Sequence, residues 1–592
     1  MIRFCQFLLL LLLWAQGATA QLSDWKNKVD IELWPAVEQG TPTDFIVMLQ
    51  QQADLSAADQ LSTKSEKGQF VYRTLQTVAQ QTQKPILEIL QRAEAPFRSF
   101  LVVNAIYARG DAQLIQALAA RPEVAVIMPN PQVMLEMPVD LQSVQELQAR
   151  ENIEWGIRRI KADQVWALGY TGQGAVVGGQ DTGYEWTHPT IRLQYRGWNG
   201  TTANHHYNWH DAIRAISPLH RDSVPNPALN PCGLDSKVPC DDHSHGTHTM
   251  GTMVGDDGMG NQIGVAPGAR WIAARNMERG YGTPATYTEC FEWFLAPTDL
   301  NGQNPRPELA PHVINNSWSC PELEGCNASN WALMERAINN LRAAGVVVVQ
   351  SAGNSGAFCH TVNAAAAIFE GAFSVGASRQ NDTIANFSSR GTVIADGSGR
   401  LKPNVVAPGV GVRSAVRGGG YSTWNGTSMA GPHVAGVVAL LISANPALAG
   451  QVALIESIIE ETAQSMLSNQ DCGGLSGMDV PNPVYGYGRI DALAAVQRAL
   501  QLTSTDSTVK QYEVAIFPNP VRDNTVTLRL TGFRGDVALR LFNANGQLLQ
   551  SHRWSAQNIL LETIPVHHLP SGVYFYHITG AGATISGKIV KQ

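Results

Sequence analysis

Three short segments of this 592-residue chain carry a carboxylate, an imidazole and a hydroxyl that could act together. Asp181 ends the Val-rich run of GAVVGGQDTG, His245 opens HGTHTMG, and Ser428 stands in NGTSMAGPHVAGVVALL. A serine hydroxyl becomes an effective nucleophile when a neighbouring base takes its proton, and histidine titrates near neutral pH. A carboxylate in turn fixes the tautomer of the imidazole and stabilises its charged form. These residue types therefore predict nucleophilic attack of a serine on a carbonyl carbon.

The residues around Ser428 predict how a helix would position this hydroxyl. Helix interiors disfavour Gly and accept Pro near their start, so NGTSMAGP predicts a helix that begins beside Ser428, with Pro432 in its first turns. The first N–H groups of a helix have no partner inside it, and the helix dipole favours negative charge there. Ser428 is therefore either a simple helix cap or a nucleophile with anion stabilisation beside it.

The elements that must position these residues lie between about residue 155 and residue 500. Apolar β runs such as GAVVGGQDTG, HVINNSW and GVVVVQSAGN alternate there with helical stretches such as WALMERAINNLRAAG. Continuous apolar strands between helices predict an α/β fold, a parallel sheet with helices on both faces. Sites in such sheets gather outside the carboxyl ends of the strands, which is where QDTG and QSAGN stand.

The three segments occur in the order Asp, His, Ser, which is the order of the subtilisin arrangement. They resemble the corresponding segments of the subtilisin-like serine peptidases, the subtilases, and the resemblance covers the whole 155–500 region. It implies that Asp181 orients the base, that His245 is the base and that Ser428 is the nucleophile. The stretch GNQIGVAPGARWIAARN further resembles the bacillopeptidase F branch of this family.

Two more strand ends carry the same resemblance. QSAGNSG resembles the oxyanion-hole segment of the family, which implies Asn354 as a side-chain donor and the backbone N–H of Ser428 as a second donor. Fixed donors stabilise the charge of a tetrahedral intermediate without reorganising. NNSWS resembles the strand that lines the substrate, so Ser317, Trp318 and Ser319 are expected to form one wall of the specificity pocket. Substrate would pair there as an added strand.

Other interpretations of these segments are weaker. DDHSHGTH offers carboxylates and imidazoles to a metal ion, but no H-E-x-x-H occurs and Gly246 disfavours a helix that presents ligands on one face. His433 is expected to pack in the core, and Cys359, close after Asn354, to be a disulfide partner rather than a second nucleophile. Esterase or lipase action is disfavoured because G-T-S-M-A lacks the G-x-S-x-G elbow.

The predicted chemistry requires no cofactor, but a structural calcium ion is left open. The family often binds calcium, yet Thr190 stands where many relatives carry an aspartate ligand. The loop GDDGMGNQIG contains Asp256, Asp257 and Asn261, whose oxygens are ligands of the right hardness. A solvated surface loop explains the same residues equally well.

The N-terminus and the cysteines predict export. Residues 1–20 combine a positive start, an apolar run and the small-residue cleavage site ATA, which predicts a secretory signal; the length of the run disfavours a retained anchor. Seven cysteines follow, and an oxidising compartment favours disulfides. Short loops make Cys232–Cys240 and Cys320–Cys326 candidate pairs, and the odd number leaves at least one thiol free or paired between chains.

A small α+β module is predicted ahead of the central region. DFIVML, FLVVNAIYARG and PEVAVIMPN predict strands, and DAQLIQALAAR predicts a helix. Residues 21–138 resemble the peptidase inhibitor I9 propeptide, which in relatives templates folding and blocks the cleft until it is cut off. Residues 139–154 are polar without a strong core pattern, which predicts a linker with the maturation site.

The tail is predicted to be a separate small domain. Residues 501–512 form a polar Ser/Thr linker, and residues 513–592 alternate apolar residues with turn signals, which predicts a small all-β sandwich. FPNPVRDNTVTLRL and LPSGVYFYHITG resemble the type A C-terminal sorting domain of the type IX secretion system, which implies a Gram-negative cell. A carbohydrate-binding sandwich is disfavoured, because a sugar site needs convergent polar and aromatic groups and Trp554 is the main candidate for stacking.

Together these features predict a secreted serine endopeptidase made as an autoprocessed zymogen, released or attached to the outer cell surface. Expected partners are protein or peptide substrates, its own propeptide as inhibitor and the type IX machinery, and we expect a monomer. The net charge of -7 gives no basic footprint for nucleic acid. We expect the rate to rise with pH as His245 loses its proton. The alternative from another class is a catalytically inactive adhesin or binding module on the same fold, and the complete set of site residues argues against it.

Overall fold

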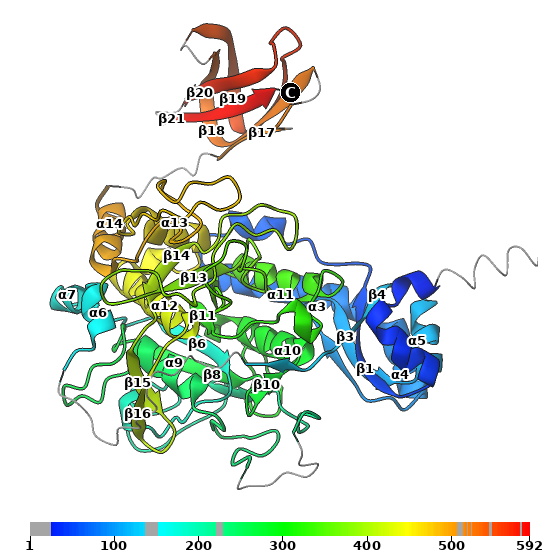
Figure 1. Ribbon diagram of the computed structural model, residues 1–592. Helices are drawn as coiled ribbons and strands as arrows, with labels where there is room; N and C mark the ends of the chain where they lie inside the picture. The colour runs from blue at the N-terminus through cyan, green and yellow to red at the C-terminus, as the bar shows by residue number, and fades with distance from the viewer. Residues whose placement is uncertain are drawn as a thin grey trace, which may run out of the picture. The chain divides into compact units, whose positions relative to one another are not determined.

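A computed structural model describes residues 25–135, 152–220, 229–505, 513–517, 519–521, 524–543, 547–580 and 583–591. The chain forms two compact units, residues 1–500 and residues 501–592 (Figure 1). The predicted signal peptide and most of the predicted maturation linker lie outside the described residues.

The first unit begins with an N-terminal module, residues 25–135, in which helices cover a small sheet. Its strands pair antiparallel in the order β2-β3-β1-β4. Alternate residues of a strand face opposite sides, so along β1 Phe45 packs into the module's own core while Ile46 joins a core shared with the central domain. The module's elements are η1 Trp25–Lys28, η2 Ile31–Leu33, α2 Trp34–Gln39, β1 Thr43–Leu49, η3 Ser56–Gln60, α3 Lys64–Thr82, α4 Lys84–Arg92, β2 Phe97–Phe100, β3 Ala105–Gly110, α5 Ala112–Ala119, β4 Val124–Pro129 and β5 Val133–Met134.

The central domain is built on a seven-stranded sheet in the order β14-β13-β12-β11-β6-β8-β7, and every pair in it is parallel. This confirms the predicted parallel sheet. Its strands are β6 Val176–Asp181, β7 Trp209–Asp211, β8 Arg270–Arg275, β11 Val313–Asn316, β12 Val347–Ser351, β13 Phe373–Ser378 and β14 Val405–Pro408.

Helices cover both faces of this sheet (Figure 1). Val348 of β12 belongs to the core formed with α10, Pro284–Leu295, and α11, Trp331–Ala343. Its neighbour Val349 faces the opposite side, where it lies against Gly431 of α12. The other described elements of the domain are α6 Trp155–Arg159, α7 Ala162–Ala167, α8 Pro189–Arg192, α9 His245–Val254, β9 Met277–Glu278, β10 Tyr281–Gly282, η4 Pro307–Leu309, η5 Glu322–Glu324, β15 Val412–Val416, β16 Gly420–Trp424, α12 Thr427–Ala444, η6 Pro446–Leu448, α13 Val452–Glu461 and α14 Ala492–Thr505.

Among the described residues, α12 is the one helix long and apolar enough to cross a membrane, but 94% of it is buried inside the protein. That burial is the environment of a core helix. The sequence predicted a linker from residue 501, but helix α14 extends to Thr505 and so includes the first residues of that linker.

The second unit is an all-β domain, as predicted. The strands of this domain pair antiparallel. The first half of β18 pairs with β17, and the second half of β18 pairs with β20. A register shift between Thr531 and Phe533 separates the two halves, and one apolar cluster joins residues from both. The strands are β17 Glu513–Phe517, β18 Thr525–Phe542, β19 Leu548–Pro565, β20 Gly572–Gly580 and β21 Ala583–Lys591.

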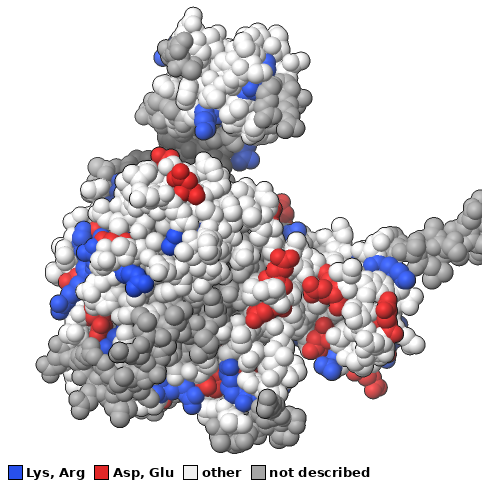
Figure 2. All heavy atoms as spheres, in the orientation of Figure 1, with Lys and Arg blue, Asp and Glu red and all other residues white. Residues whose placement is uncertain are grey.

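Three disulfides are formed, Cys232–Cys240, Cys320–Cys326 and Cys359–Cys472, and Cys290 is the free cysteine among the described residues. Both predicted short-loop pairs are confirmed, and Cys359 is a disulfide partner. The surface in Figure 2 is mostly neutral, and on this face the described Lys and Arg side chains stand in small groups without forming a continuous basic strip.

Candidate active site

Asp181 and His245 form a buried pair at the carboxyl end of the central sheet. Asp181 is the last residue of β6 and His245 is the first residue of α9. Nδ1 of His245 lies 2.8 Å from Oδ1 and 2.9 Å from Oδ2 of Asp181. Because a carboxylate accepts hydrogen bonds, Nδ1 is the nitrogen that carries the proton and Nε2 is left as the basic one. The pair has the orientation that a general base requires.

Ser428 is the second residue of α12, and Pro432 is the sixth, so the helix begins where the sequence predicted. Proline has no N–H, so Pro432 cannot donate to the carbonyl oxygen of Ser428 four residues earlier. The hydroxyl of Ser317, just beyond the end of β11, donates to that oxygen at 2.9 Å instead. This bond holds the first turn of α12 against the sheet.

The hydroxyl of Ser428 donates to the backbone oxygen of Ser317 at 3.1 Å. Within the described part of the chain, Nε2 of His245 is buried and has no hydrogen-bond partner. The structure therefore brings Asp181 and His245 together directly but does not form the Ser428–His245 bond in this conformation. The two residues start helices α9 and α12, which pack against each other, and catalytic hydrogen bonds often form fully when substrate is bound.

Asn354 lies beside the start of α12, in the segment that follows β12. Its Oδ1 accepts from the backbone N–H and from the hydroxyl of Thr427, at 2.8 and 2.9 Å. The hydroxyl of Thr427 also accepts from the N–H of Gly353 at 3.2 Å. Two bonds to the residue before Ser428 thus fix the oxygen end of the amide, and the donor NH₂ stands at the other end of the same planar group.

The three residues predicted to line the substrate differ in their surroundings. The hydroxyl of Ser317 accepts from the side-chain amide of Asn315 at 2.8 Å, and Ser319 is half-buried. The indole of Trp318 is buried and stacks on the ring of Tyr287 with 4.0 Å between the ring centroids. The Trp318 side chain therefore packs in the core, and what it can present to a substrate is its backbone.

Asp241 and His248, which lie near His245 in the sequence, make hydrogen bonds within the protein. Asp241 accepts from the N–H groups of His243, Ser244 and Thr247, which caps α9. Nε2 of His248 lies 3.2 Å from each of two backbone carbonyl oxygens, and burial lowers the pKa of His248 to about 3. In the described ranges no group of three or more His, Cys, Asp or Glu side chains could hold a metal ion.

An aromatic side chain next to the imidazoles of His248 and His245 was not predicted from the sequence. The indole of Trp424, at the end of β16, stacks on His248 with 4.5 Å between ring centroids and lies 6.4 Å from His245. His433 is buried, as expected, and its Nδ1 lies 2.9 Å from the backbone oxygen of Met429.

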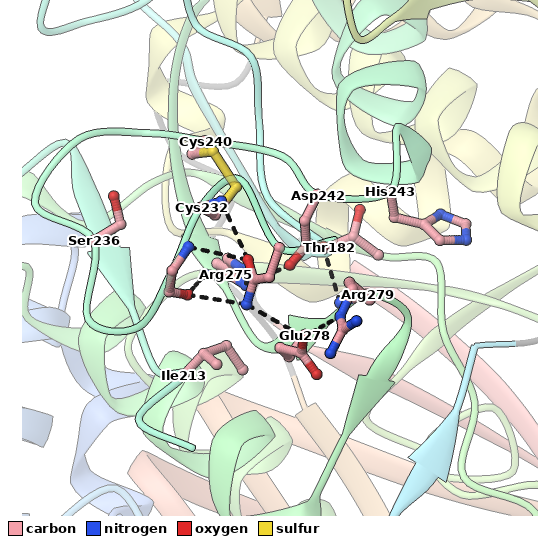
Figure 3. Close-up of polar contacts among 12 residues, drawn as sticks. Thr182, Ile213, Cys232, Ser236, Cys240, Asp242, His243, Arg275, Glu278 and Arg279 are labelled. Carbon is pink, nitrogen blue, oxygen red and sulfur yellow. Dashed lines mark hydrogen bonds and ion pairs between the residues drawn. A yellow bond between two sulfur atoms is a disulfide. The ribbon is translucent and has the colours of Figure 1, made fainter. Parts of the chain in front are cut away.

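A buried ionic cluster around Arg275 was also missed (Figure 3). The Arg275 guanidinium, at the end of β8, bonds the carboxylates of Asp242 and of Asp211, the latter at 3.1 Å. The other oxygen of Asp242 accepts from the backbone N–H of Arg279 at 2.9 Å. Burial raises the pKa of Asp242 to about 7, against the opposing pull of the Arg275 charge. The cluster ties the loop ahead of His245 to the turn between β9 and β10.

That turn leads into β10, where the end of the N-terminal module is added as an antiparallel strand. Val133 and Met134 of β5 pair with Gly282 and Tyr281. The N–H of Leu135 donates to the oxygen of Gly280 at 2.7 Å. An extended segment of the chain thus lies along an edge strand of the central domain.

Further contacts fasten the module to the two helices on the same side. Oε2 of Glu292, on α10, accepts from the N–H of Val102 at 3.0 Å, and Asn340 of α11 donates to the oxygen of Val102 at 2.6 Å. Arg98 and Glu289 form an ion pair at 3.0 Å. These bonds and the shared apolar core make the module an integral part of the first unit.

Comparison with known proteins identifies the families of the central domain and of the tail. Residues 172–488 match the model of the subtilase family, and residues 515–592 match that of the secretion system C-terminal sorting domain. Bacillopeptidase F of Bacillus subtilis is 34% identical over 506 residues, which are 80% of this chain and 32% of that protein. Subtilisin Savinase of Lederbergia lenta is 30% identical over 353 residues, which are 59% of this chain and all of that protein. The chain thus spans about a third of the length of Bacillopeptidase F and the full length of Savinase.

Proposed function

Because the chain belongs to the subtilase family, we propose that it is a secreted serine endopeptidase whose catalytic residues are Asp181, His245 and Ser428. The observation that carries this proposal is the buried Asp181–His245 pair. It orients an imidazole base at a sheet edge next to the helix start that holds a serine. The sorting domain of the tail supports secretion, and we propose that the type IX machinery recognises it.

In the proposed reaction the Ser428 hydroxyl leaves the oxygen of Ser317 and turns to Nε2 of His245. As Oγ bonds the carbonyl carbon of a peptide, His245 takes its proton. The C–N bond then breaks, and the same proton passes to the leaving amine, which gives an acyl-enzyme. Water deprotonated by His245 releases the acid and restores Ser428. Asp181 keeps the imidazole in the required tautomer and stabilises its charged form.

We further propose that Asn354 and the backbone N–H of Ser428 stabilise the oxyanion. The bonds from Thr427 to Oδ1 support this role, because they leave the amide no freedom to flip its donor away. Donors that are fixed in advance stabilise developing charge without a cost of reorganisation. We propose that Ser317, Trp318 and Ser319 line the substrate, Trp318 through its backbone.

The N-terminal module is proposed to be an inhibitory propeptide. The pairing of β5 with β10 supports this, since an extended segment that occupies an edge strand prevents a substrate from pairing there. Cleavage in the predicted linker, residues 139–154, would release the module from the mature enzyme. We propose that this cleavage is autocatalytic, so that Ser428→Ala would be secreted uncut.

A serine-directed fluorophosphonate probe and a quenched fluorescent protein substrate test the proposed activity. The secreted wild type should take up one probe molecule and hydrolyse the substrate, while Ser428→Ala should do neither. An inactive adhesin on the same fold would be unlabelled in both forms. Mass spectrometry of the protein termini in the same samples should show removal of the module in the wild type alone.

A further inference from the structure

A buried arginine contacts the loop whose residues Asp256, Asp257 and Asn261 were considered above as calcium ligands. Arg413 lies in β15, and its side chain is 2% exposed. Its Nη1 lies 3.0 Å from Oδ1 of Asn261 and 3.2 Å from Oε1 of Glu154. The guanidinium carbon also lies 4.2 Å from the centre of the Tyr421 ring, which is a cation–π distance.

The remaining candidate ligands of this loop are engaged by the loop itself. Oδ1 of Asp256 accepts from the N–H of Gly258 at 2.8 Å. Oδ1 of Asp257 accepts from the N–H groups of Met259 and Asn261 at 2.8 and 3.2 Å. One oxygen of each carboxylate is therefore used to shape the turn.

These residues do not fit a calcium ion. Calcium takes six to eight oxygen ligands, and the amide oxygen of Asn261 already accepts from a cation. A second cation bound to that oxygen would lie close to the guanidinium and be repelled by it. The Thr190 hydroxyl is hydrogen-bonded to the hydroxyl of Tyr421 at 2.7 Å, so it is engaged within the protein.

The same loop is joined to the first described residues of the central domain. The N–H of Gln262 donates to the oxygen of Asn152, and the N–H of Glu154 donates to the oxygen of Gln262, both at 3.0 Å. Trp155 adds a bond from its indole N–H to the oxygen of Gly411 at 2.8 Å. Arg413 thus lies where the loop, the domain's first segment and β15 meet.

We propose that Arg413 is the resident cation of this site, so that the loop of residues 256–261 and residues 152–154 are held together without a metal ion. Arginine suits this role because it stays charged at every working pH, presents several donors in a rigid fork and stacks on aromatic rings. Residues 152–154 are the last residues of the proposed maturation linker, so after a cleavage on their N-terminal side the same guanidinium would still anchor them through Glu154.

Thermal unfolding of the full chain tests this proposal. All variants carry Ser428→Ala to prevent autolysis, and each is measured in EDTA and in excess calcium chloride. The midpoint of the parent should differ by less than about 1 °C between the two conditions. Arg413→Gln should lower the midpoint by about 5 °C or more, because it removes the cation that faces a largely buried carboxylate. The control Arg158→Gln, at an exposed arginine near the same segment, should stay within about 1 °C of the parent.

If Arg413→Gln does not fold, Arg413→Lys replaces it: the charge remains and the fork is lost, so a smaller drop is expected, again without a response to calcium. Two results would overturn the proposal. One is a calcium-dependent rise of the parent midpoint that Asn261→Ala abolishes. The other is an arginine variant that unfolds at the parent midpoint in EDTA.

Discussion

Ser317 and Ser428 are joined by two reciprocal hydrogen bonds, in which each hydroxyl donates to the backbone oxygen of the other residue, at 2.9 and 3.1 Å. The first of them is formed because Pro432 cannot supply the N–H that the Ser428 oxygen would receive in a regular helix. The residue proposed as nucleophile is therefore positioned by the strand that is proposed to line the substrate.

Ser317→Ala tests this relationship. The Ser428 oxygen loses its donor, and a buried unpaired carbonyl costs about 1–3 kcal/mol, so the first turn of α12 should shift. We expect kcat for a peptide substrate to fall about tenfold or more, since small misplacements of reacting groups are costly. Adding Pro432→Ala supplies a new helical N–H and should restore part of the loss. Ser398→Ala, on an exposed turn, serves as control. Wild-type kcat in Ser317→Ala would contradict this assignment.

Asn354→Ala tests the proposed oxyanion donor. Removal of one donor should lower kcat by about 10²–10³-fold and leave KM nearly unchanged, since the interaction is made in the transition state. Asn354→Asp retains acceptors for Thr427 but has no donor, so it should be at least as slow. If Asn354→Asp retained high activity, the side chain would be an anchor for Thr427 and no oxyanion donor. Steady-state kinetics of both variants on one peptide substrate decides between these two roles of Asn354.

The sequence predicted those features that depend on local residue types. Continuous Val-rich runs indicated β6, β11 and β12, and the glycine and proline around Ser428 located the start of α12. The order Asp, His, Ser indicated the family. What the sequence could not show were contacts between distant segments, such as Cys359–Cys472 with a sequence separation of 113 residues.

Two side chains show why the sequence alone could not predict such contacts between distant segments. Trp318 stands in a segment expected to face substrate, but only packing against Tyr287 decides that its indole turns into the core. Arg275 lacks a recognisable motif, because its partner Asp211 lies 64 positions away. Spacing predicts which elements form, but the pairing of buried charges depends on how these elements pack.

The ion pairs of Arg275 predict that the stability losses of single variants in this cluster do not add up in the double variant. Arg275→Met leaves Asp211 and Asp242 buried without their cation, which should lower the free energy of unfolding by about 3–5 kcal/mol. Adding Asp242→Asn removes one of the unpaired charges, so the double variant should be less destabilised than the sum of the single variants. Urea unfolding in the Ser428→Ala background measures this coupling. Strict additivity would show that the two charges do not interact.

The burial of His248 leads us to expect that the folded protein loses stability in acid. Burial lowers its pKa to about 3 from a usual 6.5, so the unfolded chain binds a proton below pH 6.5 that the folded protein accepts only near pH 3. Stability is therefore lost as pH falls through this window, by roughly 4 kcal/mol for this one group. His248→Asn should flatten the dependence of the unfolding midpoint on pH between 6.5 and 4.5. Substitution of the exposed His206 should leave that slope as it is, and an unchanged slope in His248→Asn would contradict the assignment.

The most direct test of the proposed mechanism is the location of a fluorophosphonate adduct by peptide mass mapping of the secreted, matured protein. We predict that the probe modifies Ser428 alone in the wild type. His245→Ala keeps the serine but should not remove its own module, so it is compared after an added protease has removed the module, and it should then be labelled at least about a hundredfold more slowly. A protein that cleaves peptides while Ser428 stays unmodified, or a His245→Ala variant labelled at the wild-type rate, would contradict the account.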